Sequence, residues 1–151
     1  MEINSLDKSY IETLNDLKQK IKSAQIKAAL SVNTEMILLY WEIGKTILEK
    51  QEQEGWGAKI IDKLSMDLKR TFPEMRGFST RNLKYMRKFA ENYLEKTIVQ
   101  EVLAQITWYH NITLLDKIKN TNESLWYGQQ TVENGWSRKV LVHQIENQLY
   151  Q

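Results

Sequence analysis

The amino-acid sequence predicts an all-α protein. Its 151 residues include one proline and six glycines, which leaves few of the turn signals that separate short strands. The apolar and β-branched residues recur every three or four positions, the spacing of amphipathic helices, and not at the alternating spacing of strands. A hydrophobic content of 42% over this length can form a substantial core. We therefore expect a single compact multi-helix bundle that spans residues 1–151.

Composition excludes several classes of protein. The chain has no cysteine, so it contains neither disulfides nor zinc sites built on thiolates. Residues 1–15 lack the apolar stretch of a signal peptide, and no apolar run reaches the length of about eighteen residues that could cross a bilayer. These features predict a soluble, cytoplasmic protein with no membrane partner.

Two apolar stripes predict helices in the first third of the chain. The first stripe consists of Tyr10, Leu14, Leu17, Ile21, Ala24 or Ala28, and Leu30. The second consists of Met36, Leu39, Tyr40, Ile43 and Ile47, flanked by Trp41 and Leu48. Between the stripes Asn33 can cap a new helix, but nothing forbids a single bent rod through residues 31–34. Gly55 is expected to end the second helix as a left-handed C-cap.

The middle of the chain predicts two helices joined by a short connection. One face of the first helix carries Ile60, Ile61, Leu64 and Leu68. This helix is expected to end at Phe72-Pro73, because proline pushes the preceding residue out of the α region. The connection covers residues 72–78, and Ser79 is a good N-cap for a helix that begins at Thr80.

Apolar spacing predicts four further helices in the last third of the chain. Their apolar residues are Ile98, Val102, Leu103 and Ile106; Ile112, Leu115 and Ile118; Leu125, Trp126 and Val132; and Val140, Leu141, Ile145 and Leu149. Thr121 is expected to cap the third of these helices, and Asn134-Gly135 to end it. Ser137 is expected to cap the last one.

A dense cluster of positive charge occupies residues 69–88. Its seven basic residues and one acid, Glu74, give this segment a net charge of +6. Because the whole chain carries +2, the other 131 residues together carry −4. The basic residues are Lys69, Arg70, Arg76, Arg81, Lys84, Arg87 and Lys88. Such a separation of charge predicts a surface for a polyanion, with nucleic acid as the first candidate. The alternative is a helix surface that carries lysine and arginine for solubility alone.

The helix of residues 80–93 separates its charges from its apolar side chains. At about 100° per residue from Arg81, the apolar side chains fall between about 80° and 200°. These are Leu83, Met86, Phe89, Ala90 and Tyr93. Arg81, Lys84 and Lys88 fall between about 300° and 360°, and the only acid, Glu91, lies near about 280° at the edge of this stripe. We expect the apolar face to turn inward and the cationic face to turn to solvent.

We expect this helix and the preceding one to form a helix-turn-helix-like element that binds DNA. The connection is longer than the usual three or four residues, so the element would be a variant. Arg81 and Asn82 would lie closest to base edges, whereas Lys84 and Lys88 would mainly bind phosphates. The full set of expected nucleic-acid-binding residues is Arg70, Arg76, Arg81, Asn82, Lys84, Tyr85, Arg87 and Lys88. RNA is an alternative to DNA as the ligand.

The sequence offers little support for catalysis. Asp67-Leu68-Lys69 is an acid-x-lysine string, but residues two positions apart on a helix point about 200° apart and cannot converge on one metal ion. Neither His110 nor His143 has a partner at metal-binding spacing, and we expect His110 to cap a helix or bond to a backbone carbonyl. No phosphate-cradling glycine motif or nucleophile elbow occurs. We therefore expect no catalytic residue, no metal ion and no cofactor.

Eight short strings occur in a fixed order along nearly the whole chain. They are Leu39-Tyr40-Trp41-Glu42-Ile43-Gly44-Lys45, Gly55-Trp56-Gly57, Leu64-Ser65-x-Asp67-Leu68, Phe72-Pro73, Gly77-Phe78-Ser79-x-Arg81-Asn82-Leu83, Met86-Arg87, Ile106-x-Trp108-x-His110 and Asn134-Gly135-Trp136-Ser137. Read together, they resemble the N-terminal domain of the YhcG-type family of predicted PDDEXK nucleases. The resemblance implies a helical bacterial domain that binds DNA or positions an enzyme ahead of a C-terminal nuclease domain. It also implies a link to restriction or other defence loci.

Two functions follow from these observations. The chain ends at Gln151, where sequences of the YhcG-type family continue toward the nuclease, so we expect the catalytic domain to be absent from this polypeptide. The resemblance and the basic surface together predict a non-catalytic domain that binds DNA and targets an attached nuclease. The alternative is a protein-interaction or dimerisation module, in which apolar stripes of the first two helices pair between the subunits of a homodimer and the basic face is incidental.

Overall fold

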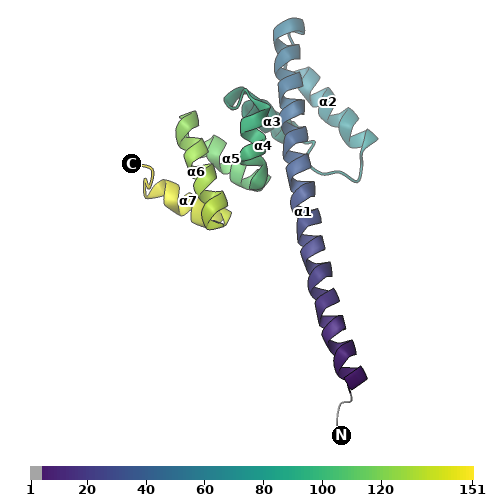
Figure 1. The fold of residues 1–151 in the computed structure, drawn as a ribbon. Coiled ribbons are helices and arrows are strands. Elements are labelled where there is room, and N and C mark those ends of the chain that lie inside the picture. The colour runs from purple at the N-terminus through teal and green to yellow at the C-terminus, as the bar shows by residue number, and fades with distance from the viewer. Residues whose placement is uncertain (1–4) are drawn as a thin grey trace. The chain divides into compact units, whose positions relative to one another are not determined.

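The computed structural model describes residues 5–151, and this part of the chain is all-α, as the sequence predicts (Figure 1). Its elements are α1 (Ser5–Glu54), α2 (Ala58–Thr71), α3 (Thr80–Asn92), α4 (Lys96–Glu101), a 3-10 helix η1 (Leu103–Gln105), α5 (Trp108–Lys117), α6 (Thr121–Asn134) and α7 (Arg138–Glu146). The fold divides into two units, one that ends at Val32 and one that comprises Asn33–Gln151. The described core lies in the second unit.

The first helix continues without a break through residues 31–34. Asn33 does not cap a new helix, because its side-chain amide donates hydrogen bonds to the backbone carbonyls of Ala104, at 3.2 Å, and Ile106, at 3.0 Å. Thr34 donates a further bond to the Ala104 carbonyl at 3.2 Å. Of the two alternatives that the sequence leaves open, the single helix is therefore confirmed.

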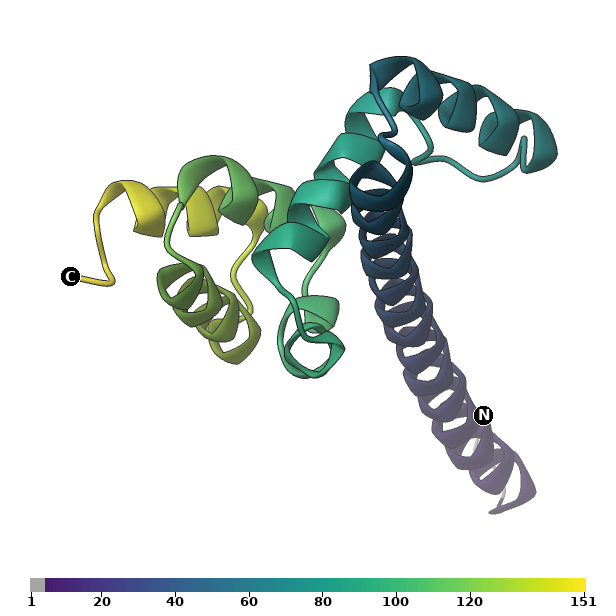
Figure 2. The same cartoon turned by 90° about the horizontal axis from the view of Figure 1, so that it is seen from above.

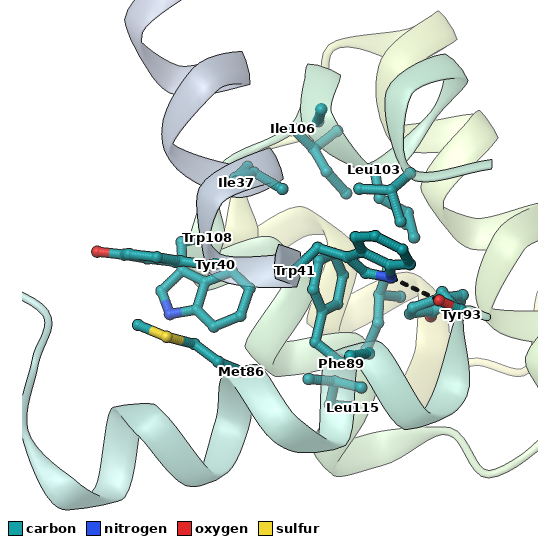
Figure 3. Close-up of a cluster of buried hydrophobic side chains, with 14 of the residues drawn as sticks. Ile37, Tyr40, Trp41, Met86, Phe89, Tyr93, Leu103, Ile106, Trp108 and Leu115 are labelled. Carbon is teal, nitrogen blue, oxygen red and sulfur yellow. Dashed lines mark hydrogen bonds between the residues drawn. The ribbon is translucent and has the colours of Figure 1, made fainter. Parts of the chain in front are cut away.

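Within the second unit, α1 contacts α3 so closely that their backbones almost touch. A Cβ atom added to Gly44 would lie only 1.9 Å from the backbone oxygen of Met86. The indole N–H of Trp41 donates a hydrogen bond of 2.6 Å to the backbone carbonyl of Tyr93, just beyond the end of α3 (Figure 3). Two independent contacts therefore hold these helices together.

The buried face of α1 differs in part from the predicted stripe. The buried apolar residues of this face are Ile37, Tyr40, Trp41 and Ile47. Leu39, which the sequence places in the stripe, is 42% exposed, so the prediction is wrong at that position. The stripe is rotated because Gly44 and Trp41 must face α3.

Aromatic rings fill the space between α1, α3 and α5. The ring of Trp108 meets the rings of Tyr40 and Phe89 edge to face, at centroid separations of 4.9 and 5.2 Å, and Phe89 meets Tyr93 at 5.4 Å (Figure 3). Such pairs contribute roughly 0.5–1.5 kcal/mol each beyond the burial of their surface. Trp108 thus ties the N-terminal end of α5 to both of the other helices.

Most of the predicted helix boundaries are confirmed. Gly55 and Gly135 adopt left-handed φ angles of +65° and +62° where α1 and α6 end. Ser79 and Ser137 cap α3 and α7, and their side chains accept backbone N–H groups. The cap of α6 is Asn120 and not Thr121, because the Asn120 side chain accepts the Glu123 N–H at 3.0 Å.

The last third of the chain differs from the sequence prediction at one helix. The helix expected around residues 98–106 is divided between α4 and η1, and Thr107 then caps α5. The three helices α5, α6 and α7 contact one another and lie side by side in Figure 2. None of the helices in residues 5–151 is both long and apolar enough to span a lipid bilayer.

The close approach at Gly44 predicts the effect of adding one methyl group. Alanine in the middle of a helix is normally more stable than glycine by about 1 kcal/mol. Gly44→Ala should instead lower the free energy of unfolding by about 1–3 kcal/mol, because the new Cβ meets the Met86 backbone. Urea unfolding followed by circular dichroism measures this difference. Gly57→Ala is the control, because no atom lies within 4 Å of its added Cβ; a stabilised Gly44→Ala variant would refute the contact.

Candidate nucleic-acid interface

The two faces of α3 have the arrangement that the sequence predicts. Its apolar residues are buried, with Leu83, Met86 and Phe89 completely inaccessible to solvent and Ala90 and Tyr93 each 2% exposed. At the N-terminus the Ser79 hydroxyl accepts the Asn82 backbone N–H at 3.1 Å, which fixes where the helix begins. Contacts with α1, α2 and α5 bury this apolar face and so turn the opposite face to solvent.

The outward face of α3 carries four basic side chains. Arg81, Lys84 and Lys88 are exposed and Arg87 is half-buried. Within the described part of the chain, none of the four has a carboxylate oxygen within 4.0 Å. Together with Tyr85, Glu91 and Asn92 they line a shallow hollow of about 470 Å³ along the helix. The basic residues therefore lie on one surface, and their charges are not neutralised by ion pairs there.

Two of the predicted side chains on this face, Lys88 and Tyr85, already have hydrogen-bond partners. Lys88 donates to the Leu115 carbonyl at 3.0 Å, and the Tyr85 hydroxyl donates to the Asp116 carboxylate at 2.8 Å. The Arg81 guanidinium lies over the Tyr85 ring, 5.7 Å from its centroid, so Tyr85 orients a cation. On α3 the charged ends of Arg81, Lys84 and Arg87 have no hydrogen-bonding partner among the described residues.

Both the nitrogen and the oxygen of the Asn82 side-chain amide form hydrogen bonds. Its nitrogen donates to the Gly77 carbonyl at 2.7 Å, and its oxygen accepts the indole N–H of Trp108, also at 2.7 Å. These bonds join the α2–α3 connection, α3 and α5. The sequence suggests that Asn82 contacts bases, but in this structure its side chain stabilises the connection.

The two remaining predicted residues lie outside α3. Arg70 is on α2, and its guanidinium is 4.0 Å from the Asp67 carboxylate in an exposed pair that contributes little to stability. Arg76 is on the α2–α3 connection and lines a second cavity that Arg81 also lines. The structure therefore brings Arg76 next to the basic face of α3, whereas the Arg70 guanidinium lies beside Asp67 on its own helix.

Tyr109 and Arg138 are among the residues of this second cavity that sequence reasoning did not assign to a site. Tyr109 is on α5, and Arg138 is the first residue of α7, where its Nε donates to the Thr113 hydroxyl at 3.1 Å. No local signal marks either residue, because only the packing of α5 and α7 brings them toward Arg81. The cavity has a volume of about 630 Å³.

His110 has a structural role at the N-terminus of α5. The His110 ring bonds to the Thr107 hydroxyl at 2.6 Å and to the Trp136 carbonyl at 2.8 Å, so the predicted capping and carbonyl bonds are both confirmed. Asp67 and Lys69 both lie on α2, and side chains two positions apart on a helix point in different directions. In residues 5–151 no three histidine, aspartate or glutamate side chains lie close enough to hold a metal ion.

Comparisons with known proteins agree with the resemblance. The sequence profile of the DUF1016 N-terminal domain matches residues 16–151. The chain is 28% identical over 163 aligned residues to a protein of Escherichia coli strain K12 that bears the name "Putative nuclease YhcG". That alignment covers 87% of this chain and 43% of the relative, so the chain spans less than half of the relative's length. No solved structure matches the chain significantly.

The hydrogen bonds of Asn82 predict that this residue matters for stability. In Asn82→Ala the Gly77 carbonyl and the nearly buried Trp108 indole N–H lose their partners, which should lower the free energy of unfolding by about 1–3 kcal/mol. Chemical unfolding of the variant measures the loss. Lys84→Ala, on the same helix but exposed, should change the same quantity by less than about 0.5 kcal/mol. Equal stabilities of the two variants would contradict this role.

Proposed function

Since this chain belongs to the DUF1016 N-terminal domain family, we propose that it binds DNA and directs a nuclease to that DNA. The chain itself would not cleave DNA. The observation that carries the proposal is the face of α3 on which Arg81, Lys84 and Arg87 have no carboxylate partner while the opposite face is buried. A solvated helix face normally interleaves acids with bases. Here Glu91 is the only acid on the helix.

The basic face suits the phosphate backbone of a nucleic acid. Each lysine or arginine that neutralises a phosphate releases condensed counterions, which drives association at low salt. Lys84, Arg87 and Lys88 would bind phosphates, and Arg70 and Arg76 would add positive charge on the preceding helix and its connection. The net charge of +6 in residues 69–88 would also speed the encounter with DNA.

The α2–α3 pair would act as a variant helix-turn-helix. The two helices contact each other, and the Ser65 hydroxyl donates to the Phe78 carbonyl at 2.5 Å, which anchors the connection to α2. In this arrangement α3 is the groove-facing helix, and Arg81 in its first turn is the side chain nearest to base edges. Tyr85 would support Arg81 by stacking, and Asn82 would hold the connection in position.

The nuclease activity itself would belong to another part of the full-length protein. The name of the E. coli relative describes a nuclease, and the present chain spans 43% of that relative. We propose that the helical domain delivers such a nuclease domain, attached at its C-terminal end, to DNA in the bacterial cytoplasm. A role in restriction or another defence system fits this arrangement.

Duplex binding should depend on salt and on the α3 face. If about four phosphates are neutralised, affinity for a random-sequence duplex of about 20 base pairs should fall roughly 100-fold between about 50 and 200 mM salt. Arg81→Glu combined with Lys84→Glu should abolish binding, because it reverses two charges on the binding face. Fluorescence anisotropy measures both effects. An A-form RNA duplex of the same sequence tests whether RNA is preferred.

A charge-matched double variant distinguishes the contribution of the α3 face to binding from the contribution of the overall net charge. Lys119→Glu combined with Lys139→Glu makes the same change in net charge at exposed positions after α5 and on α7. This control should bind the duplex with nearly unchanged affinity. Equal losses of duplex affinity in the two double variants would show that binding depends on net charge alone. The α3 face would then not be the binding surface.

A second candidate function is self-association through residues 10–28, which belong to the first unit. Six residues recur alternately at spacings of four and three, the heptad pattern of a coiled coil: Tyr10, Leu14, Leu17, Ile21, Ala24 and Ala28. Tyr10, Leu17 and Ile21 are 49–66% exposed, an unusual extent for large apolar side chains on one stripe. A second copy of the chain would cover this stripe.

The salt dependence of such a dimer should be opposite to that of DNA binding. Lys20 beside the seam pairs with Asp16 of its own helix at 3.0 Å, but Lys18 and Lys27 add further positive charge on either side of the seam, so like charges would line both edges of the dimer. Raising salt from about 50 to 500 mM should therefore strengthen the dimer by screening this repulsion. Light scattering after size exclusion, across protein concentrations, measures the effect.

Variants on the same helix test whether the seam is responsible. Leu17→Ser combined with Ile21→Ser should give a monomer, because it removes two central apolar contacts. Ile26→Ser changes an exposed residue away from the seam and should leave the dimer intact. A wild-type chain that stays monomeric at high salt and high concentration would exclude this second function.

A further inference from the structure

The cavity of about 630 Å³ is built entirely by the second unit and continues from the basic face of α3. Its walls come from α1, the α2–α3 connection, α3, α5 and α7. Arg81 and Tyr85 line both this cavity and the hollow along α3, so the two depressions meet at these side chains. Its volume is typical of sites that enclose a small molecule.

The cavity carries an excess of positive charge. Arg76, Arg81 and Arg138 reach it from three different segments, against a single acid, Asp116. Among the described residues none of these arginines has a carboxylate oxygen within 4.0 Å, and the Asp116 carboxylate already accepts the Tyr85 hydroxyl. Guanidinium groups bind phosphate oxygens through paired hydrogen bonds. The cavity is therefore suited to an anion.

The cavity also has aromatic walls. Tyr109 lines it and is 68% exposed, so its ring can accept a stacked partner. Tyr40 and Trp108 lie deeper and are fixed by their edge-to-face contact. Burial raises the pKa of the Tyr40 hydroxyl, which keeps this wall neutral. An exposed aromatic ring beside arginines that lack carboxylate partners is a combination suited to binding a single nucleotide.

The edge of the cavity is held in place by the α2–α3 connection. Gly77 has a φ angle of +106°, and a Cβ atom added there would lie 2.2 Å from the Tyr40 hydroxyl oxygen. Asn82 bonds to this glycine and to Trp108, which joins the entrance to the aromatic floor. The cavity is thus preformed by bonded residues and does not depend on one mobile side chain.

We propose that this cavity binds one nucleotide, with its base stacked on Tyr109 and its phosphate bound by Arg76, Arg81 and Arg138. The nucleotide comes either from an unpaired 5′-phosphorylated end of DNA that lies along α3, or from solution as a free mononucleotide. The first source rests on the proposed function, since the strand must then reach the cavity from the basic face. Recognition of a strand end would direct the domain to broken or frayed DNA.

The experiment compares two DNA probes that differ only at one end. One is a blunt duplex of about 20 base pairs, and the other carries an unpaired three-nucleotide 5′-phosphorylated overhang. Stacking of one base predicts that the wild-type chain binds the overhang probe about tenfold more tightly. Tyr109→Ala and Arg138→Ala should each remove this preference without weakening binding of the blunt duplex, whereas Tyr109→Phe and Lys139→Ala should keep it.

Further probes show whether the bound nucleotide is a DNA end or a free mononucleotide. They also test the cavity independently of the proposed function. A 5′-hydroxyl overhang should lose most of the preference if the arginines bind the phosphate. Calorimetry with dAMP tests the free nucleotide, and binding that Arg138→Ala abolishes supports the cavity even if no duplex binds. Equal affinity for blunt and overhang probes, with no dAMP binding, would overturn the cavity proposal. Salt-dependent binding of the blunt duplex would in that case still support the proposed function.

Discussion

The close contact between α1 and α3 determines the orientation of the proposed functional surface. The backbone of α3 approaches Gly44 so closely that no side chain fits between the two helices. The hydrogen bond from Trp41 to the Tyr93 carbonyl fixes the C-terminal end of α3. These constraints bury the apolar face of α3, so its basic residues must face solvent. The charge of the surface is therefore a consequence of how the core packs.

The same core supports the cavity next to α3. Trp108 contacts Phe89 and Tyr40 in the core and donates its indole N–H to Asn82 at the surface. Asn82 in turn bonds to Gly77 in the connection that carries Arg76. A continuous series of contacts thus runs from the buried rings to the connection that carries Arg76. Arg81 precedes Asn82 on α3 and lines both the hollow and the cavity.

Local sequence signals predicted the helices well and the long-range contacts poorly. Ser79, Ser137 and Gly135 were predictable because caps depend on residues within one turn, and the two faces of α3 followed from helical spacing alone. Asn33 was ambiguous because its partners are backbone carbonyls about seventy residues away. Leu39 was misplaced because the direction of the buried face depends on Gly44 meeting α3. Tyr109 and Arg138 had no local signal, since only tertiary packing brings them to Arg81.

The most direct test of the basic α3 face is a lysine-reactivity footprint of the whole chain with and without duplex DNA, read by mass spectrometry. Lys84, whose amine is exposed and has no bonding partner among the described residues, should lose reactivity when DNA binds. Lys119, which follows α5, and Lys139, on α7, should react equally in both states. Protection confined to lysines outside α3, or none at a DNA concentration that saturates binding, would contradict the account.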